Sequence, residues 1–313
     1  MKFLSAAETR ERLPFPALID SLQAMFARGC ELPLRQVHEI VAPDGSVLTS
    51  LVMAAWQRGG CYGVKVVNIA PGNAARGLPG LHASYVLHDA TTGVPLAWLD
   101  GDEITARRTA ATSALAAAWL ARGDARSLAI VGAGRVARLL APAHRVRRPI
   151  EQVAVWARTR ERAVALVAEL AAQGFDARVA ASVEDAVADA DIVSCATLAR
   201  APVVRGQWLR ADAHLDLIGS FTPSMREADD DCFAGAAVFV DSDDATKKSG
   251  DLIGPIGAGV LAPESIGTLT ALARGARSPR GAGVQRTVFK SVGSALEDLA
   301  AALLVHGADS AHH

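Results

Sequence analysis

The sequence predicts an α/β protein with a doubly wound parallel sheet and a second, α+β domain that has a mainly antiparallel sheet. Its 313 residues suffice for about two domains. Short strand-like runs separated by Gly and Pro clusters fill the first third, whereas strands and helices alternate from about residue 127 onward. We expect residues 1–112 and 288–313 to form the antiparallel domain and residues 113–287 to form the parallel one.

The periodicity of apolar residues predicts the individual elements. Residues 14–28 carry apolar side chains at helical spacing, and the Ala-rich run at about 105–122 is expected to be a second helix. A hairpin turn is predicted over 89–93, and the strands of the first domain at 35–41, 47–55, 63–68, 83–89 and 95–100. Strands of the second domain are expected at 128–131, 153–156, 177–179, 191–195, 213–218 and 238–240, followed by a last helix at 288–305.

Composition argues against several classes of partner. The formal net charge is −1 and the pI about 6.7, so there is no basic excess to bind a nucleic-acid backbone or an anionic membrane. No signal peptide is visible, and the most apolar run, 109–121, is shorter than the ~20 residues of a membrane span. Cys30, Cys61, Cys195 and Cys232 form no close pair in the sequence, which argues against a zinc site and against disulfides. We therefore expect a reduced, cytoplasmic protein that binds no metal, nucleic acid or membrane.

The strongest local motif joins a strand to a helix near residue 132. Apolar residues 128–131 precede Gly132, Gly134 and Ala137 in the pattern GxGxxA. Gly132 allows a tight turn, Gly134 lets the backbone approach a pyrophosphate, and Ala137 lets the helix pack closely on the strand. The helix N-terminus favours the phosphate anion. Because the motif follows a strand and heads a βαβ series, it predicts a Rossmann domain that binds a nicotinamide dinucleotide, rather than a Gly-rich turn without a ligand.

The residues after the second strand of this domain indicate which dinucleotide binds. No carboxylate follows strand 153–156 to bind the ribose hydroxyls of NAD(H). Ala157, Arg158, Thr159 and Arg160 stand there instead, and two guanidinium groups with a hydroxyl suit a phosphate monoester. We predict that NADP(H) is preferred and that NAD(H) can also bind. The alternative is that these residues are the solvated, basic start of a helix.

Three cations of the first domain are candidates for binding a substrate. Lys65 stands in an otherwise apolar strand, where an ammonium group is costly to bury without a partner. It either faces solvent or meets an anion, and by strand alternation it shares a face with Gly63 and Val67. Arg108 opens an apolar helix, and Arg35 stands at the start of a predicted strand. Taken singly, each of them can equally be a surface charge.

Stretches along almost the whole chain resemble the ornithine cyclodeaminase/mu-crystallin family. In the order of the family they are 63–73 (GVKVVNIAPGN), 87–97 (LHDATTGVPLA), 100–101 (DG), 104–111 (ITARRTAA), 131–134 (VGAG) and 288–293 (VFKSVG). The resemblance implies a homodimer in which the first domains pair across a two-fold axis. It implies an active site between the two domains of each chain, with Arg35, Lys65 and Arg108 holding the carboxylate of the substrate near the nicotinamide. Lys65 is the candidate catalytic residue.

Further cofactor-binding candidates stand near the ends of strands or helices. Asp241 follows a strand at its C-terminal end, where ligand crevices lie, and the resemblance implies that this region borders the nicotinamide pocket. The remaining candidates are Thr109, Arg135, Val136, Thr197, Val292 and Gly293.

Two departures from the family pattern argue against a diamine substrate. Ornithine cyclodeaminases resemble one another in a segment whose aspartate handles the substrate amine, and Phe221 occupies that position here. A second carboxylate of the family is absent just before Met53. Because a buried ammonium group without carboxylate partners is costly, ornithine is not the expected substrate.

These observations lead to the hypothesis that the protein reduces cyclic ketimine acids, such as pyrroline-2-carboxylate or piperideine-2-carboxylate, with NAD(P)H as hydride donor. Arg35, Lys65 and Arg108 orient the carboxylate, and Met53 and Phe221 line the substrate pocket, with Phe221 against the apolar ring. An alanine-dehydrogenase-like enzyme and an ornithine cyclodeaminase remain alternatives. From a different class, so does a non-catalytic, NADPH-dependent ligand-binding protein similar to mu-crystallin.

Overall fold

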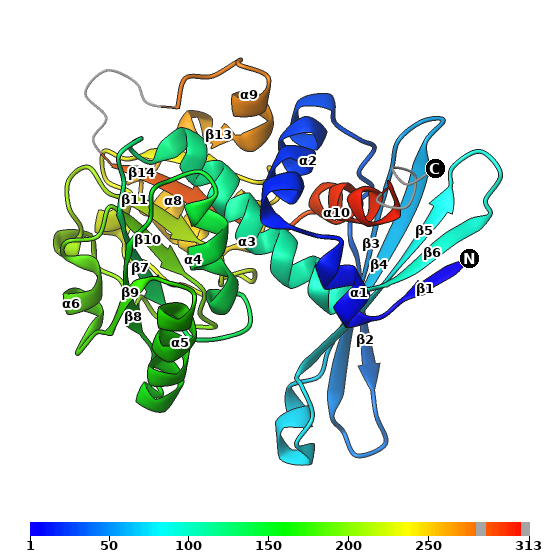
Figure 1. Cartoon of the computed structure of the whole chain (residues 1–313), viewed down its shortest axis with the longest axis horizontal. Helices are drawn as coiled ribbons and strands as arrows, with labels where there is room; N and C mark the ends of the chain where they lie inside the picture. The colour runs from blue at the N-terminus through cyan, green and yellow to red at the C-terminus, as the bar shows by residue number, and fades with distance from the viewer. Residues whose placement is uncertain (280–285, 308–313) are drawn as a thin grey trace. The chain divides into compact units, whose positions relative to one another are not determined.

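The computed structural model describes residues 1–279 and 286–307, and it divides into two compact units (Figure 1). Unit 1 comprises Met1–Arg108 and Ser294–His313, and unit 2 comprises Thr109–Gly293. Unit 1 holds a mostly antiparallel sheet, and unit 2 holds a parallel sheet that alternates with helices along the chain. The predicted fold class is therefore confirmed. Within the described residues, no helix combines the length and the hydropathy that crossing a membrane requires.

The sheet of unit 1 has the strand order β1-β6-β5-β4-β3-β2, in which β1 and β6 are parallel and the other neighbours antiparallel. Its elements are β1 (Lys2–Leu4), α1 (Ala6–Glu11), α2 (Phe15–Arg28), β2 (Gln36–Val41), β3 (Val47–Trp56), β4 (Cys61–Ile69), η1 (Pro71–Arg76), β5 (Leu81–Asp89), β6 (Pro95–Asp100), the start of α3 (Gly101–Leu120), and α10 (Ala295–Gly307). The hairpin turn predicted over 89–93 forms, because Asp89 Oδ1 accepts the N–H groups of Thr91 and Thr92, and Gly93 adopts a φ of +74°.

Helix α10 closes the core of unit 1, where it packs against α2, β3 and β4. The apolar face of α2 is buried through residues such as Leu18, Leu22 and Phe26, as its helical spacing predicts. Ser21 of the same helix donates a hydrogen bond to the carbonyl oxygen of Ala300 at 3.0 Å. The C-terminal helix is therefore an integral part of the layer that covers the antiparallel sheet.

The sheet of unit 2 has the order β13-β12-β14-β11-β10-β7-β8-β9 and is parallel throughout. Its elements are the remainder of α3, then β7 (Ser127–Val131), α4 (Ala137–Arg145), β8 (Gln152–Trp156), α5 (Arg160–Ala172), β9 (Asp176–Val179), α6 (Val183–Val187), β10 (Ile192–Cys195), η2 (Gly206–Trp208), β11 (His214–Leu217), η3 (Asp230–Cys232), β12 (Ala237–Val240), α7 (Ala245–Lys248), α8 (Gly250–Gly257), η4 (Pro263–Ser265), β13 (Gly267–Thr268), α9 (Leu269–Ala273) and β14 (Thr287–Lys290). The strand order reverses between β7 and β10. In such sheets ligands bind at this point, outside the carboxyl ends of the strands.

The helix predicted over 288–305 is wrong in its first part. Residues of β14 form a strand inside the parallel sheet, and α10 begins only at Ala295. Val288 and Phe289 are both buried, so an apolar run of this length fits a central strand as well as a helix, and periodicity does not separate the two. Residues 288–293 accordingly lie in unit 2, although the prediction assigned them to the first domain.

Two smaller differences concern short or capped elements. Strands β1 and β13 are too short to produce an alternation that a prediction can use. Helix α3 begins at Gly101, earlier than predicted, and Asp100 Oδ1 accepts the backbone N–H of Glu103 at 2.8 Å. Such a side-chain cap satisfies a donor that the first turn of a helix leaves open, so the helix extends back to this aspartate.

Candidate active site

Lys65 lies on the buried face of β4, together with Gly63 and Val67. Its side chain is 1% exposed, and the ammonium group meets the Asp298 carboxylate of α10 at 2.7 Å. It also donates a hydrogen bond to Thr105 Oγ1 of α3 at 3.3 Å. The sequence left solvent or an anion as possible surroundings for this lysine, and the structure gives an anion that the chain itself supplies.

Arg108 of α3 binds the same carboxylate. Its Nε donates to Asp298 Oδ1 at 3.0 Å, and its Nη1 donates to Glu297 Oε2 at 2.7 Å. The Arg108 side chain is 6% exposed, and both carboxylates are fully buried. Lys65, Arg108, Glu297 and Asp298 form what we call the unit 1 cluster, with two cations and two carboxylates. Charged groups are tolerated in a protein interior when they are paired in this way.

Lys65 and Asp298 of the unit 1 cluster stay charged at neutral pH. Burial lowers the pKa of Lys65 to about 8, while the charge of Asp298 opposes this shift. Burial alone would raise the pKa of Asp298, but the charges of Lys65 and Arg108 outweigh it and hold that pKa below its ordinary value. The lysine is therefore protonated and the aspartate ionised at pH 7.

Neighbouring strands place three predicted substrate residues in one row across the sheet. Lys65 on β4 lies opposite Met53 on β3 and Tyr85 on β5. Arg35 is half-buried immediately before β2, and continuing the register of β2 and β3 by one residue puts it opposite Met53. Because adjacent strands are about 4.8 Å apart, Arg35 and Lys65 are about 10 Å apart along this row. Arg108 is on α3 and not on these strands, but it is linked to Lys65 of the row because both bind Asp298.

Tyr85 explains why a glycine stands at position 63. A Cβ at Gly63 would collide with the phenol of Tyr85, which leans over that residue. Tyr85 is 1% exposed, and its hydroxyl oxygen has no hydrogen-bond partner among the residues that the structure describes. This tyrosine is a member of the row that sequence reasoning missed.

Sequence reasoning also missed Glu297 and Asp298, although a signal for them is present. The two adjacent carboxylates interrupt an apolar helix whose neighbouring residues Leu296, Leu299 and Ala300 are all buried. Buried carboxylates require cationic partners. A lysine buried in an apolar strand likewise requires an anionic partner. The sequence therefore contained enough to suggest that Lys65 pairs with a carboxylate of this helix.

The glycine turn of unit 2 joins β7 to α4. Gly132 has a φ of +118°, and a Cβ there would lie 2.6 Å from the carbonyl oxygen of Ala196 at the end of β10, so this position requires glycine. At Gly134, no atom of the described residues lies within 4 Å of the position a Cβ would take. Ala137 is fully buried at the start of α4. The turn therefore leaves backbone open where a ligand can approach it.

The predicted phosphate-binding residues follow β8 directly. Ala157 is half-buried, and Arg158, Thr159 and Arg160 are exposed at the start of α5. Neither the Arg158 nor the Arg160 side chain forms an ion pair or hydrogen bond within the part of the chain that the structure describes. Because β8 pairs in parallel with β7, these residues and the glycine turn lie together at the carboxyl ends of the two strands. This end of the sheet suits the phosphates of a dinucleotide, since it offers open backbone and two unpaired guanidinium groups.

A buried carboxylate joins the loops after β10 and β11. Glu227 accepts hydrogen bonds from the backbone N–H and hydroxyl of Thr197, at 2.7 and 2.8 Å. It also accepts the backbone N–H groups of Gly219 and Ser220, at 2.7 and 3.2 Å. A Cβ at Gly219 would collide with the backbone of Thr197, so the two loops approach each other as closely as glycine allows. Thr197, a predicted cofactor residue, is thus held in place by Glu227.

Glu227 belongs to a second group of buried charges, which we call the unit 2 cluster and which also contains Asp251 and Lys290. Lys290 Nζ of β14 lies 3.2 Å from Asp251 Oδ2, and all three side chains are fully buried. Burial raises the pKa of Glu227 to about 7; Lys290 opposes this shift and Asp251 adds to it. Asp251 Oδ1 in turn accepts the backbone N–H of Glu227 at 2.7 Å.

Three further predicted residues meet at the end of β14. Asp241 Oδ2 accepts the backbone N–H groups of Val292 and Gly293, at 2.9 and 2.6 Å. It also accepts the hydroxyl of Ser291 at 2.7 Å. Asp241 therefore shapes the loop that carries Val292 and Gly293.

The remaining predicted residues lie on three segments of unit 2. Arg135 and Val136 stand in the turn that leads into α4. Thr109 is the first residue of unit 2 and lies buried on α3. Phe221 is half-buried in the loop that follows β11, beyond the backbone groups held by Glu227.

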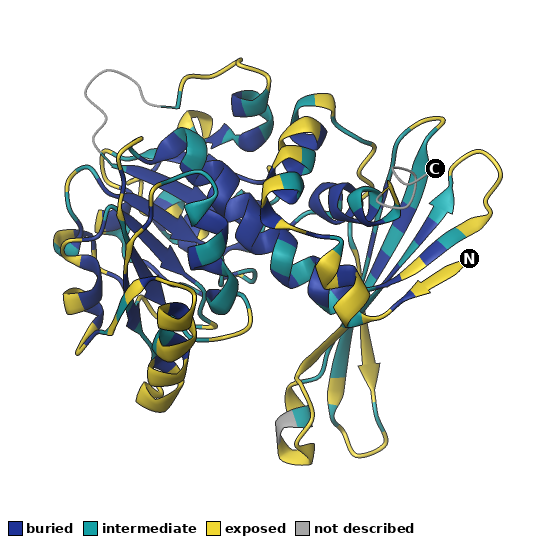
Figure 2. Ribbon diagram, in the orientation of Figure 1, coloured by how far each residue is buried: buried dark blue, intermediate teal, exposed yellow. Residues whose placement is uncertain are grey.

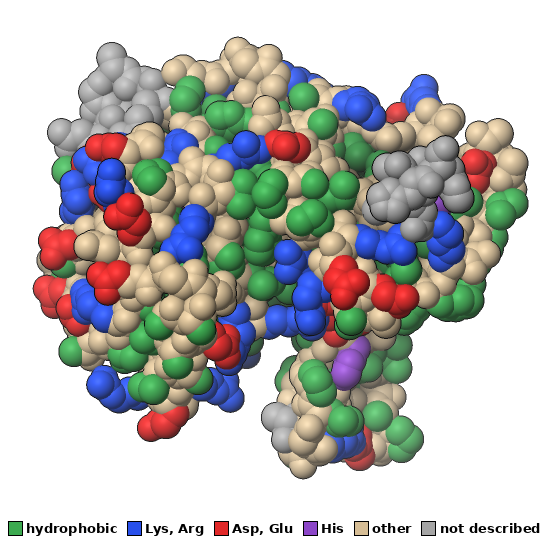
Figure 3. All heavy atoms as spheres, viewed as in Figure 1, with side chains coloured by type: hydrophobic (Ala, Val, Ile, Leu, Met, Phe, Trp, Pro, Cys, Tyr) green, Lys and Arg blue, Asp and Glu red, His purple; other side chains and the backbone are tan. Residues whose placement is uncertain are grey.

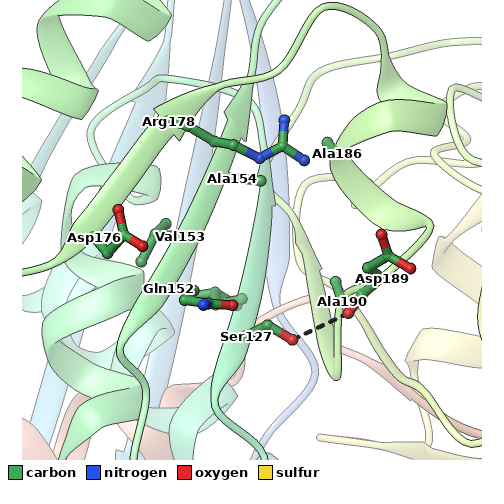
Figure 4. A pocket seen from close by; sticks show the side chains of 10 residues that line it. Ser127, Gln152, Val153, Ala154, Asp176, Arg178, Ala186, Asp189 and Ala190 are labelled. Atoms are coloured by element: carbon green, nitrogen blue, oxygen red, sulfur yellow. Dashed lines mark hydrogen bonds between the residues drawn. The ribbon is translucent and has the colours of Figure 1, made fainter.

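A cavity of about 270 Å³ lies at the opposite ends of the strands, where β7, β8 and β9 begin (Figure 4). Two of its polar side chains are bound to their neighbours. Ser127 Oγ donates to the carbonyl oxygen of Asp189 at 3.2 Å, and Arg178 pairs with Asp185 at 3.0 Å. Because it lies away from the carboxyl ends of the strands, we do not include this cavity in the candidate site.

Comparison with known proteins gives matches over nearly the whole chain. The sequence model of the ornithine cyclodeaminase/mu-crystallin family matches residues 3–312. A Delta(1)-pyrroline-2-carboxylate reductase from Paracoccus denitrificans is 40% identical over 303 residues, which cover 95% of this chain and 94% of the relative.

Two solved structures are similar to the whole fold. The Delta(1)-pyrroline-2-carboxylate reductase of Thermococcus litoralis, in complex with NADH and L-proline, has a TM-score of 0.92 and 32% identity and covers 100% of this chain and 98% of its own. An archaeal alanine dehydrogenase dimer with bound NAD has a TM-score of 0.90 and 27% identity and covers 100% of this chain and 97% of its own.

Proposed function

Since the chain belongs to the ornithine cyclodeaminase/mu-crystallin family, we propose that it is an NAD(P)H-dependent reductase of cyclic ketimine acids. It is an oxidoreductase that acts on C=N bonds, with pyrroline-2-carboxylate or piperideine-2-carboxylate as substrate. The relative from Paracoccus denitrificans and the Thermococcus litoralis structure with NADH and L-proline support this substrate class. Within the structure, the proposal rests on the row of Lys65, Arg108 and Arg35, because it gathers cations for a substrate carboxylate.

In the proposed reaction, unit 1 holds the substrate by its carboxylate. The Lys65 ammonium forms an ion pair with Asp298 and donates a hydrogen bond to Thr105, and we infer that it keeps a further N–H for a ligand. A protonated imine is already electrophilic, so the task of Lys65, Arg108 and Arg35 is to fix its orientation. Met53 in the row and Phe221 in the loop after β11 offer apolar surface in place of a carboxylate. Each of these side chains therefore suits an apolar ring better than a second ammonium group.

Unit 2 holds the nicotinamide cofactor, which supplies the hydride. The turn 132–134 accommodates its pyrophosphate, and Arg158, Thr159 and Arg160 accommodate a 2′-phosphate, which favours NADP(H) over NAD(H). Ala157, Thr109, Arg135, Val136, Thr197 and the loop of Val292 and Gly293 complete the proposed cofactor site, and Asp241 holds that loop.

Oxidation of NADPH and NADH by the purified protein tests the function. The substrates are pyrroline-2-carboxylate, piperideine-2-carboxylate, and pyruvate with ammonia. We expect turnover of a cyclic imine, faster with NADPH. Turnover with pyruvate and ammonia alone would make the protein an amino-acid dehydrogenase, the second candidate, which the similarity to an alanine dehydrogenase favours. Tight NADPH binding without any turnover, also with ornithine, would instead indicate a ligand-binding protein.

A double variant tests the cofactor preference by itself. Arg158→Ser with Arg160→Ser should weaken NADPH binding at least about tenfold, since each charge-assisted hydrogen bond contributes about 1.5–3 kcal/mol. NADH binding should not change. Arg162→Ser, in the first turn of α5 and likewise exposed, is the matched control. Equal losses of affinity for both cofactors would contradict a 2′-phosphate site.

We also propose that the chain forms a homodimer through one of the two edges of the unit 1 sheet. Strand β2 is at that edge, and all six of its residues are exposed, including Val37 and Val41 at 58% and 67% (Figure 2). Val47 at the start of β3 and Leu78 after η1 are exposed as well, and hydrophobic side chains lie among polar and charged ones in this part of unit 1 (Figure 3). An exposed apolar edge strand is a surface that proteins cover by association. Light scattering should give a dimer for the wild type and a monomer for Val37→Lys with Val41→Lys.

A further inference from the structure

Asp298 links two cations that come from different elements. Its Oδ2 lies 2.7 Å from Lys65 Nζ of β4, and its Oδ1 lies 3.0 Å from Arg108 Nε of α3. Glu297, next to it on α10, binds Arg108 at 2.7 Å. The C-terminal helix therefore carries the anions that tie the central strand of the unit 1 sheet to α3.

We propose that Asp298 is the positioning residue of the substrate site, where one buried carboxylate fixes the Lys65 ammonium and the Arg108 guanidinium in a single arrangement and balances their mutual repulsion. Asp298 does not bind the substrate; it acts through the two cations that do. The inference rests on the proposed function, because it assigns the remaining N–H of the Lys65 ammonium to a substrate carboxylate.

Physical chemistry gives two reasons for such a residue. Long cationic side chains lose rotamer freedom when they bind a ligand, and a preformed contact removes that cost from the binding step. Two buried cations also repel each other, and the charge of Arg108 indeed lowers the pKa of Lys65, whereas the charge of Asp298 raises it. Asp298 thus keeps Lys65 protonated beside a second positive charge.

The groups that face Lys65 come from four elements. They are Glu297 and Asp298 on α10, Thr105 and Arg108 on α3, Tyr85 on β5, and Met53 on β3. Tyr85 adds no charge, since burial raises its pKa well above the ordinary value. Besides burial, which lowers its pKa most, the charges that act on Lys65 are therefore those of Asp298, Arg108 and Glu297.

Titration of Lys65 in the wild type and in Asp298→Asn tests the proposal. The sequence contains only five lysines, so the ¹³Cε signal of Lys65 can be assigned by its loss in Lys65→Arg. We expect the pKa of Lys65 to fall by about one unit or more in Asp298→Asn, since a nearby opposite charge is removed. The alkaline limb of kcat/KM for the cyclic ketimine should move to lower pH by the same amount. The imine of the substrate titrates identically with both proteins and cannot cause this shift.

Two further variants serve as controls. Glu103→Gln exchanges a carboxylate of α3 that pairs with Arg10 at 2.7 Å, and it should change neither the lysine titration nor the pH profile. Glu297→Gln should give a smaller shift than Asp298→Asn, because the Glu297 carboxylate pairs with Arg108. This ranking separates a specific effect on Lys65 from a general loss of negative charge.

An unchanged lysine titration in Asp298→Asn would overturn the inference, even with reduced kcat/KM, because a merely structural role lowers activity at every pH alike. If that variant does not fold, Lys65→Arg decides. Its guanidinium stays charged, so the alkaline limb should move to higher pH, and a limb that stays at the wild-type position would refute the role of Lys65. The lysine titration requires no turnover. A wild type that reduces no ketimine therefore refutes the proposed function separately from this inference.

Discussion

Each unit of the molecule buries a lysine in its sheet, and the two lysines have different surroundings. Lys65 of unit 1 shares Asp298 with Arg108, so that two cations face two carboxylates. Lys290 of unit 2 pairs with Asp251 and influences Glu227, so that one cation faces two carboxylates. Both lysines are at most 1% exposed. Equal burial therefore coexists with different balances of charge, since cations and carboxylates are equal in number in unit 1 and carboxylates are in excess in unit 2.

The difference appears in the proton affinity of the carboxylates. The pKa of Asp298 lies below its ordinary value because two cations outweigh its burial. The pKa of Glu227 rises to about 7 through its burial, with one ammonium group in opposition. A cluster with enough cations stays ionised and keeps those cations oriented for a ligand. A cluster rich in carboxylates holds protons near neutral pH, and its main contacts are with the backbone of the loops that it orders.

Replacement of Lys65 should have the largest effect of the variants considered, and it should act on activity. Without such an effect, the contrast between Lys65 and Lys290 would fail. Lys65→Met keeps the length of the side chain and removes the charge. We expect kcat/KM for the cyclic ketimine to fall at least about 30-fold, because losing a buried, hydrogen-bonded charge costs about 2–5 kcal/mol of binding. NADPH affinity, measured by fluorescence titration, should stay unchanged. Near-normal kinetics would reduce Lys65 to a structural ion pair.

Replacement of Lys290 should act on stability instead. Lys290→Met leaves Asp251 and Glu227 without their ammonium partner, and removing one member of a buried pair costs about 3–5 kcal/mol. Urea unfolding measures this loss. Lys248→Met is the control, since Lys248 and its partner Asp244 are partly exposed, and a loss of at most about 0.5 kcal/mol is expected there. Similar losses for both variants would mean that Lys290 does not balance the unit 2 cluster.

A methyl group at Gly63 should disturb unit 1 without affecting the cofactor. It would collide with the phenol of Tyr85, which is itself buried. Overpacking of this kind costs about 1–3 kcal/mol of unfolding free energy. Gly134→Ala in unit 2 is the opposite case, because it meets open space and should weaken NADPH binding with little loss of stability. Denaturation and cofactor titration of both variants would sharpen the division of labour between the units.

The sequence predicted those parts of the fold whose pattern is local. The alternation in β3 and β4 and the glycine turn after β7 each reflect the residues of one element, and all three form as expected. Strand β14 was mistaken for helix because Val288 and Phe289 are buried on both sides in the centre of a parallel sheet, which removes the alternation.

Prediction of the candidate site ended where contacts between distant residues begin. Lys65 was recognised as a cation in need of a partner, but the partner Asp298 lies more than two hundred residues later in the sequence. The role of Glu227 was not predicted, because its carboxylate accepts hydrogen bonds from backbone N–H groups and no pattern of side chains indicates such bonds. Such pairings follow from the packing of α10 on the sheet and from the loops after β10 and β11, which periodicity does not encode.

The smallest expected effect is on the pH dependence of the free energy of unfolding, and it concerns Glu227 of the carboxylate-rich unit 2 cluster. With a pKa of about 7 in the folded state against 4.5 as its ordinary value, Glu227 adds stability that is fully present at low pH and is lost as the pH rises through 7. Between pH 6.5 and 8, its ionisation should cost about 1 kcal/mol. Glu227→Gln cannot ionise, so urea unfolding at the two pH values should show a difference in slope of this size between wild type and variant. Other groups, including Lys65, titrate equally in both proteins and cancel. Equal slopes would mean that Glu227 is already ionised at pH 6.5, and the two clusters would then hold their carboxylates in the same state despite their different numbers of cations.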